Sequence, residues 1–340
     1  MGADATLSVQ SSWQLAVGSG QWAFRFSPFR YFSISLFLLP LPSLSQTSAN
    51  QMQYLINPSC LSPALFENTT RFSGFLTYRS EWTGFQGKPS VALLDISGIA
   101  HNNMYFGGEI RYQTAMVFRS FYLALKYAYQ IRIREEQYLT LGVNGIFYQN
   151  ILDLTAATIL DPGDPLLQGI DRITQTKVNI GAGLSYRFSS FILSFYAPML
   201  LNNRSAYDQA VEGSLSLPQN LLVYISNDFI INREWLMKPT VRINILTGSP
   251  TLFELSLLAG KIDQFWFTAM FRSNMMMGLT VGGQLWKHVV ISYGYEFFTG
   301  NSPGVHTGTH EITLGYKIGK TRIVKPELKD YFSATGNVTQ

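Results

Sequence analysis

A two-residue alternation recurs through most of the chain and restricts its fold more than any other feature. Residues 179–188 read NIGAGLSYRF, in which apolar side chains alternate with small or polar ones. The same alternation appears at 139–147 (LTLGVNGIF), 289–297 (VVISYGYEF) and 311–318 (EITLGYKI). Successive side chains of a β-strand point to opposite faces, so a period of two predicts strands with one apolar face and one small or polar face.

The number and length of these segments predict a membrane β-barrel. Only 14% of the residues are charged, against about 25% in a typical soluble domain. No apolar run after residue 50 reaches the ~20 residues of a membrane helix. We therefore expect an all-β fold, a transmembrane antiparallel up-and-down β-barrel of about 14 strands. A soluble sandwich or propeller is the alternative. The expected strands are 71–80, 89–98, 103–114, 119–131, 137–148, 177–188, 191–199, 219–229, 238–246, 251–259, 264–271, 274–283, 286–296 and 309–318.

The connections between these strands favour the barrel over the soluble alternative. The three longest, 149–176, 200–218 and 298–308, follow the fifth, seventh and thirteenth expected strands. In an up-and-down barrel all three lie at the same end. The turns at the other end, such as RIREE and GKID, are short and charged. Long external loops and short periplasmic turns are typical of outer-membrane barrels.

The two ends of the chain differ from the barrel region. Arg25 and Arg30 precede an apolar run, and Ser43 and Ser45 precede Gln46, which is the pattern of a signal peptide cleaved after Ser45. We expect a signal peptide and leader at 1–45, a periplasmic N-terminal segment at 46–70, the barrel at 71–319 and a polar, periplasmic C-terminal tail at 320–340. The single cysteine excludes an internal disulfide, and we expect it to be a free structural thiol.

The segment YRSEWTGFQGKP, residues 78–89, is interpreted as a turn between two strands rather than as an active-site loop. Tyr78 and Trp82 are expected on the lipid side, where amphipathic aromatic residues are favoured. Arg79 and Glu81 lie two residues apart and are expected to pair on the inner face. Gly84, Gly87 and Pro89 then turn the chain. Tryptophans of the aromatic girdle are expected at 82, 235, 266 and 286.

An ordered set of motifs resembles the PorP/SprF family, outer-membrane proteins of the type IX secretion and gliding machinery of Bacteroidota. The motifs are NPSC at 57–60, YRSEWTGFQGKP at 78–89, YAYQIRI at 127–133, LTLGVNGIFY at 139–148, DPGDP at 161–165, FYAPMLL at 195–201, FWFTAMFR at 265–272 and GTHEITLGYKIG at 308–319. Glu81 stands where the family usually has Gln. The residues that carry the resemblance are Asn57, Pro58, Arg79, Trp82, Gly84, Phe85, Gly87, Pro89, His310 and Glu311.

The resemblance implies a barrel in the cell outer membrane that docks or anchors a secreted surface protein with a C-terminal sorting domain. It also implies links to the periplasmic ring and motor of the secretion system. A barrel of roughly fourteen strands is too narrow for a folded adhesin, which favours docking over conduction. The partner surface is expected on the external loops 149–176 and 200–218. The formal charge of +4 gives no reason to expect nucleic acid.

A passive porin for small solutes is the alternative function. It predicts rings of charged residues in the lumen, whereas the inward faces read as rich in Gly, Ser and Thr with few charges. Single-channel conductance distinguishes the two functions.

No enzymatic or metal site is expected. His306, His310 and Glu311 lie across a loop and a strand start, with Gly308 between them, so their spacing does not converge on a metal. Asp161, Asp164 and Asp171 lack the alternation of a calcium loop. None of the four histidines lies in a nucleophile motif. We therefore expect no catalytic residue, cofactor or metal.

Overall fold

The computed structural model describes residues 51–66, 70–84, 87–101, 103–155, 172–201, 204–206, 214–216, 220–246, 249–300 and 308–320. The expected signal peptide, the tail after residue 320, and Phe85, His306, Asp161, Asp164 and Asp171 lie outside these ranges.

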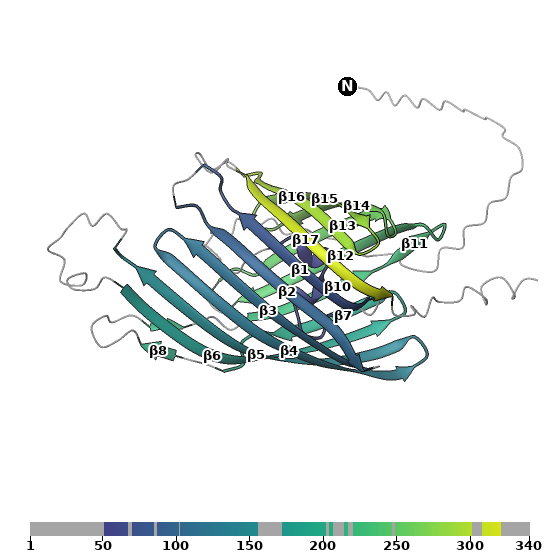
Figure 1. Ribbon diagram of the computed structural model, residues 1–340, viewed down its shortest axis with the longest axis horizontal. Helices are drawn as coiled ribbons and strands as arrows, with labels where there is room; N and C mark the ends of the chain where they lie inside the picture. The colour runs from purple at the N-terminus through teal and green to yellow at the C-terminus, as the bar shows by residue number, and fades with distance from the viewer. Residues whose placement is uncertain are drawn as a thin grey trace, which may run out of the picture. The chain divides into compact units, whose positions relative to one another are not determined.

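Within the described ranges, each of the fourteen expected strands is present, and neighbouring strands pair antiparallel (Figure 1). The pairing of the first strand with the last, and of β10 with β12, closes the sheet into a 14-stranded barrel.

The barrel strands are longer at several ends than the sequence pattern indicates. They are β1 (Thr70–Ser80), β2 (Ser90–His101), β3 (Met104–Ala115), β4 (Phe118–Arg134), β5 (Gln137–Asp153), β6 (Arg172–Phe188), β7 (Phe191–Ala197), β10 (Asn220–Asn227), β12 (Trp235–Leu246), β13 (Leu252–Lys261), β14 (Phe265–Arg272), β15 (Met276–Trp286), β16 (Val289–Phe298) and β17 (Thr309–Lys320). The short strand β11 (Phe229–Ile231) follows β10 and pairs with the start of β12.

The connection between β7 and β10 contains a hairpin that the sequence analysis missed. Its strands, β8 (Arg204–Ala206) and β9 (Ser214–Ser216), pair only with each other. Strands of three residues are too short to show a period-two pattern.

The connections fall at two distinct ends of the barrel. Those after β5, β7 and β16, which contain the three longest expected loops, lie at one end, here called the loop end. At the opposite, turn end, Glu135 and Glu136 join β4 to β5, and residues 262–264 join β13 to β14. Glu136 and Asp263 adopt positive φ angles of 60° and 59°, as tight hairpins require. The expected separation of long and short connections is confirmed.

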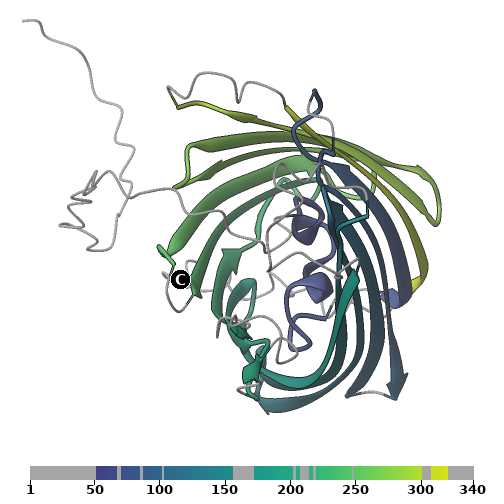
Figure 2. The ribbon, with the colours of Figure 1, turned by 90° about the vertical axis from the view of Figure 1, so that its left-hand side faces the viewer.

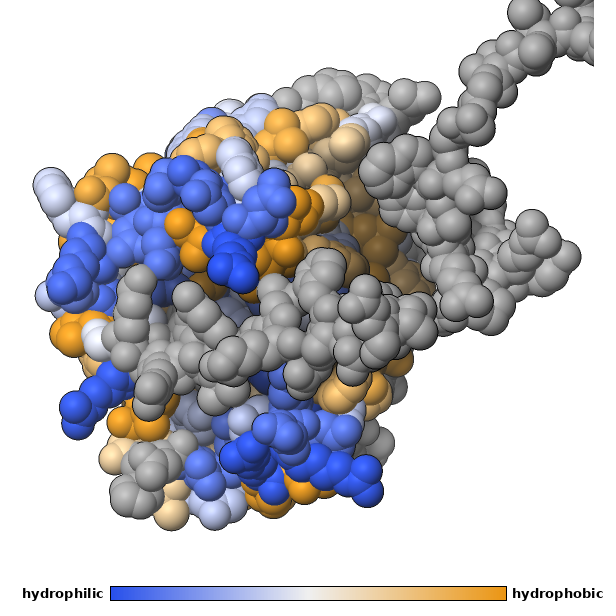
Figure 3. All heavy atoms as spheres, turned by 90° about the vertical axis from the view of Figure 1, so that its right-hand side faces the viewer, coloured by the Kyte–Doolittle hydropathy of each residue, from blue (hydrophilic) through white to orange (hydrophobic). Residues whose placement is uncertain are grey.

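The two faces of the strands differ as the alternation predicts. In β13 the outward Phe253, Leu255 and Leu257 are exposed, whereas the inward Glu254 and Ser256 are buried. Figure 3 views the turn end and shows hydrophilic residues gathered there, with hydrophobic residues on the sides. Trp82, Trp235 and Trp286 are exposed, in accord with a girdle. Trp266 was assigned wrongly, because it points inward and packs against the interior core.

Residues 51–66, here called the plug, lie inside the barrel. Figure 2, which looks toward the loop end, shows their two short helical turns within the ring of strands. These are the 3₁₀ turns η1 (Gln53–Leu55) and η2 (Pro58–Cys60). The expectation of a periplasmic segment is therefore wrong for residues 51–66. No helix in the described part of the chain is long and apolar enough to span a membrane.

The plug forms an apolar core with the barrel wall. Tyr54, Leu55, Cys60 and Leu65 pack with Leu93, Ile192, Tyr224 and Leu258. At the turn end, the ring of Phe66 stacks on Tyr105 with a centroid distance of 5.1 Å. Cys60 is buried and free, as expected. The plug therefore runs through the lumen and is part of the folded barrel.

Inward-facing glycines make room for the plug. A Cβ atom on Gly142 of β5 would lie 2.6 Å from the backbone nitrogen of Ala64, which is closer than side chains approach. A Cβ on Gly294 of β16 would lie 2.4 Å from the terminal methyl of Met52. These glycines allow the close approach of the plug to the wall.

Candidate functional site: the plugged lumen

A buried chain of ion pairs crosses one wall of the lumen near the loop end. We call it the Arg79 network. The Arg79 guanidinium contacts three carboxylates: Glu296 at 2.5 Å, Glu81 at 2.8 Å and Glu311 at 3.3 Å. Arg272 bridges Glu296 and Glu254. The network ends at Arg242, whose Nη2 lies 2.7 Å from Glu254 Oε2. It joins β1, β17, β16, β14, β13 and β12.

A second network, the Lys126 network, lies on the wall formed by β2, β3 and β4. The Lys126 ammonium lies 2.5 Å from Asp95 Oδ2 and 2.7 Å from Glu109 Oε2. Arg111 also pairs with Glu109. Each member except Arg111 is almost fully buried. Buried charges are stable only when paired and hydrogen-bonded, so removal of one partner leaves an uncompensated charge.

The plug is bound to the Arg79 network through its own backbone. The N–H groups of Met52 and Gln53 donate to the Glu311 carboxylate, at 3.0 Å and 2.8 Å. These donors lie at the start of η1, where no partner exists within the turn. The Tyr54 hydroxyl donates to Glu254 and lies 2.9 Å from Ser256 Oγ. Burial, followed by the charge of Glu254, raises the pKa of the Tyr54 hydroxyl well above its usual value, so it stays protonated as a donor.

The NPSC motif binds the plug to the Lys126 network on the other wall. Asn57 Nδ2 donates to Asp95 Oδ1 at 3.0 Å, and the Ser59 hydroxyl donates to the same oxygen at 2.6 Å. The Lys126 ammonium donates to the Ser59 carbonyl at 2.9 Å. Pro58 is the first residue of η2, a position that suits its fixed φ angle. The plug therefore contacts both networks.

The structure brings some of the family-motif residues together and separates others. Arg79 contacts both Glu81 and Glu311, and the expected pairing of Arg79 with Glu81 is confirmed. His310 faces away from Glu311, since its Nδ1 lies 2.7 Å from the Tyr293 hydroxyl on the outer side. The described residues contain no cluster of three side chains able to hold a metal ion.

The remaining motif residues shape the β1–β2 connection. The Glu81 N–H donates to the Pro89 carbonyl at 2.9 Å. The Thr83 N–H donates to the Gly308 carbonyl at 3.1 Å, which ties this connection to the start of β17. Trp82, Gly84 and Gly87 have φ angles of 48°, 155° and 75°. These contacts support the interpretation of residues 78–89 as a turn.

The expectation of a lumen with few charges is wrong. The alternation at 289–297 placed Glu296 on the inner face; the charged residues missed by the sequence analysis are Asp95, Glu109, Arg111, Lys126, Arg242, Glu254 and Arg272. Glu109 and Arg111 lie two residues apart in GGEIRYQ, and each of the others is a single charge in an otherwise apolar or small segment, such as Asp95 in VALLDIS and Lys126 in LALKYAY. In a membrane strand such a charge belongs on the inner face and needs a partner there. This rule could have identified the buried charges of the lumen from the sequence.

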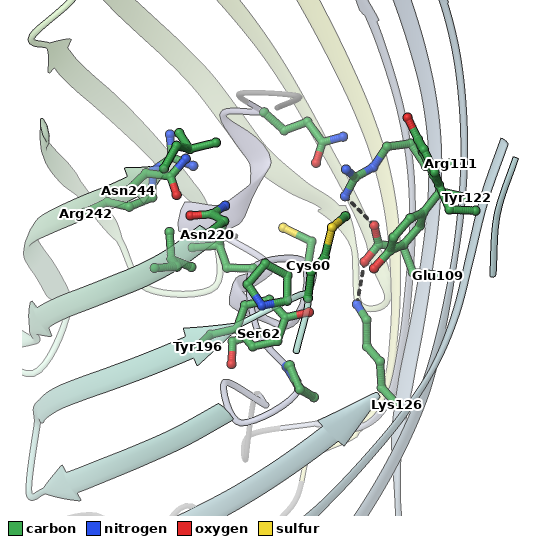
Figure 4. Close-up of a pocket in the computed structure, with 18 of the residues that line it drawn as sticks. Cys60, Ser62, Glu109, Arg111, Tyr122, Lys126, Tyr196, Asn220, Arg242 and Asn244 are labelled. Atoms are coloured by element: carbon green, nitrogen blue, oxygen red, sulfur yellow. Dashed lines mark hydrogen bonds and ion pairs between the residues drawn. The ribbon is translucent and has the colours of Figure 1, made fainter. Parts of the chain in front are cut away.

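A cavity of about 230 Å³ lies beside the plug in the loop-end half of the lumen (Figure 4). Plug residues Gln51 and Cys60 form one side of it. The strand residues that line it include Arg111, Tyr122, Tyr148, Asn220, Arg242 and Asn244. Burial raises the pKa of the Cys60 thiol above its ordinary value. Cys60 therefore lines the cavity as an unreactive thiol and is not a nucleophile.

Comparison with solved structures finds only distant matches. The matches include a FadL homologue of Pseudomonas aeruginosa (10% identity, 76% of this chain and 92% of that chain, TM-score 0.46) and Omp33 of Acinetobacter baumannii (7%, 74% and 99%, 0.43). The toluene transporter TbuX of Ralstonia pickettii matches at 10% identity, with 76% and 92% covered and a TM-score of 0.42. Identities and scores this low support no inference about ligand or function. No curated protein matches the chain.

Family comparison is decisive. The sequence profile described as "Type IX secretion system membrane protein PorP/SprF" matches residues 43–316. This range covers the plug and all barrel strands up to the last residues of β17. The chain therefore belongs to the PorP/SprF family of type IX secretion system membrane proteins, and it lies in the outer membrane as a closed β-barrel.

Proposed function

We propose that this barrel docks a secreted surface protein with a C-terminal sorting domain at the outer membrane and does not conduct it. The observation that carries the proposal is the plug, whose residues 52–59 are hydrogen-bonded to ion-pair networks on two walls of the lumen. Membership in a secretion family supplies the context. A barrel occupied by its own chain is suited to hold a partner rather than to pass one.

The charges of the lumen do not favour the porin alternative. A charged ring selects solutes when its side chains face a water-filled channel. Here Arg79, Glu296 and Arg272 neutralise one another and are almost fully buried. The Glu311 carboxylate accepts hydrogen bonds from the plug backbone. These charges therefore support plug binding rather than solute selection.

The docked protein is proposed to bind at the loop end. The expected loops 149–176 and 200–218 correspond to the β5–β6 and β7–β10 connections, which begin and end there, and loops on a rigid scaffold commonly carry recognition. The expected experiment replaces residues 154–171 and 200–218, which leaves β5 and β6 intact, with short Gly/Ser turns in a tagged barrel. Loss of the co-purified surface protein supports the proposal, and unchanged co-purification contradicts it.

The turn end is proposed to face the periplasm and the ring of the secretion system. Its connections are short, and the C-terminal tail 320–340 follows β17 at this end. Export through a signal peptide cleaved after Ser45 is part of the same proposal. Deletion of residues 321–340, followed by co-purification of ring components, tests whether the tail contributes.

Planar-bilayer recording of the purified barrel separates docking from a porin function. We expect the full-length protein to remain closed under an applied potential. Steady conductance of the unmodified protein, with saturation by a small solute, would reject the docking proposal and support the porin.

A further inference from the structure

The cavity beside the plug has polar walls on opposite sides. Asn220, Arg242 and Asn244 project into it from β10 and β12, and Arg111 and Tyr122 face them from β3 and β4 (Figure 4). Gln51 adds the plug to the lining. These five strand residues all lie in the half of their strand that is nearer to the loop end. The cavity is thus on the side from which a docked protein would approach.

Several lining groups are buried and have no partner within the described residues. They are Gln51 Nε2, Arg111 Nε, Asn220 Oδ1, Arg242 Nε and Asn244 Oδ1. Gln51, Arg242 and Asn244 are only 4%, 5% and 6% exposed. Buried polar atoms are normally hydrogen-bonded, and exceptions need an explanation. Five such atoms around one cavity indicate a binding site.

The charges at the cavity are already balanced. Arg111 and Lys126 pair with Glu109, and Lys126 also pairs with Asp95. Arg242 pairs with Glu254. The groups that remain free to bind are amide oxygens and N–H donors, which complement an uncharged partner that both donates and accepts. The main chain of an extended peptide presents this pattern.

The cavity also has surfaces for small side chains. Tyr122 lines it from β4, and Tyr196 lines it from β7 on the opposite side (Figure 4). Leu222 of β10, the cross-strand partner of Tyr196, also lines it, as do Tyr148 and Leu246. Its volume of about 230 Å³ is below the roughly 300–1,000 Å³ of pockets that enclose drug-sized ligands. It therefore suits a short stretch of chain and excludes a folded domain.

We propose that this cavity binds an extended, uncharged peptide segment of the docked surface protein. Gln51 Nε2 and Arg242 Nε would donate to its main-chain carbonyls, and Asn220 Oδ1 and Asn244 Oδ1 would accept from its main-chain N–H groups. This inference rests on the proposed docking function, which supplies a polypeptide as the partner. Because Gln51 belongs to the plug, the site exists only while the plug is in place.

Site-specific photo-crosslinking in cells tests the proposal. The probe is a benzoylphenylalanine placed at Tyr148, in the full-length tagged barrel. A second barrel carries the probe at Trp266, which faces inward but does not line the cavity. We expect the first probe to yield a protease-sensitive adduct whose mass spectrum maps to one short segment of one surface protein. We expect the second probe to yield no such adduct.

Matched substitutions on β12 give the second readout. Asn244→Leu removes an amide with an unpartnered oxygen from the cavity. Thr240→Val removes a buried, unpartnered hydroxyl from the same strand at a position that does not line the cavity. We expect the adduct to fall about tenfold with Asn244→Leu, as for about 1.4 kcal/mol of lost binding, and to be unchanged with Thr240→Val. Heat-modifiable gel mobility checks that both variants fold.

The outcomes separate this inference from the docking proposal. A surface protein that co-purifies with the barrel but gives no adduct at Tyr148 overturns the cavity inference alone. Absence of any co-purifying surface protein overturns both. An adduct that contains carbohydrate instead of peptide, or equal adduct yields for the two β12 variants, also overturns the cavity inference.

Discussion

The backbone N–H of Met52 lies 3.0 Å from each carboxylate oxygen of Glu311, 259 residues further along the chain. Gln53 donates to the same carboxylate at 2.8 Å. This carboxylate also contacts Arg79. One side chain of the last strand therefore links the plug to the Arg79 network.

Replacement of Glu311 is expected to loosen the plug. Glu311→Ala removes the acceptor of two buried backbone donors and one carboxylate partner of Arg79, which together cost about 3–5 kcal/mol. We expect intermittent single-channel openings in planar bilayers, where the unmodified barrel stays closed. Glu81→Ala is the control, because Glu81 also contacts Arg79 but is 22% exposed and does not contact the plug. Equal conductance of the Glu311→Ala and Glu81→Ala variants would contradict the inference that Glu311 holds the plug in the lumen.

Cys60 reports the position of the plug. Its thiol is buried, and burial raises its pKa above the ordinary value of 9.0. We expect maleimide to label the native barrel slowly at pH 7–8 and the urea-unfolded protein fully. The contribution of the buried thiol to stability is present below pH 9.0 and is lost as the pH rises through the higher folded value. Rapid labelling of the native protein at neutral pH would show that the plug is not seated.

Two glycines of β5 provide a matched pair for the close approach of the plug. A Cβ on Gly142 would collide with backbone atoms of Pro63 and Ala64, whereas a Cβ on Gly145 has nothing within 4 Å. We expect Gly142→Ala to increase the maleimide labelling rate of Cys60 by tenfold or more. A tenfold increase corresponds to a loss of about 1.4 kcal/mol in the free energy that holds the plug in place. Gly145→Ala should leave the rate unchanged. The plug would have to lie elsewhere if the two variants labelled alike.

Loss of one residue of the Lys126 network is expected to be costly, and replacement of its partner as well is expected to reduce that cost. Lys126→Met leaves Asp95 without its cation and should lower the free energy of unfolding by about 3–5 kcal/mol. Addition of Asp95→Asn should recover part of this loss, since the two residues are coupled. Heat-modifiable gel mobility across a urea series measures both variants. Lys261→Met, which removes an exposed ion pair with Glu234, should change stability by less than about 1 kcal/mol. Additive losses for Lys126 and Asp95 would show that they act independently.

The strands were predictable because their signal is local. In β13 and β16 the alternation is unbroken, and the side of each residue follows from its parity. The same rule failed at FWFTAMFR, where three aromatic residues in succession hide the phase, and Trp266 was placed on the wrong face.

The plug and its binding site were not predictable in the same way. Residues 51–66 show no period of two, and their partners lie far away in sequence. Asn57 binds Asp95, 38 residues later, and Met52 binds Glu311. Arg79, Glu296 and Arg272 lie on three different strands, so only closure of the barrel brings them together. The NPSC motif was noticed, but its chemical role depends on that closure.

A comparison of the surface and secreted proteomes of cells with and without this gene tests the docking proposal most directly. We predict the loss of one or a few large surface proteins that carry a C-terminal sorting domain, and their return on complementation with the intact gene. Identical surface and secreted proteomes in the two strains would contradict the docking function.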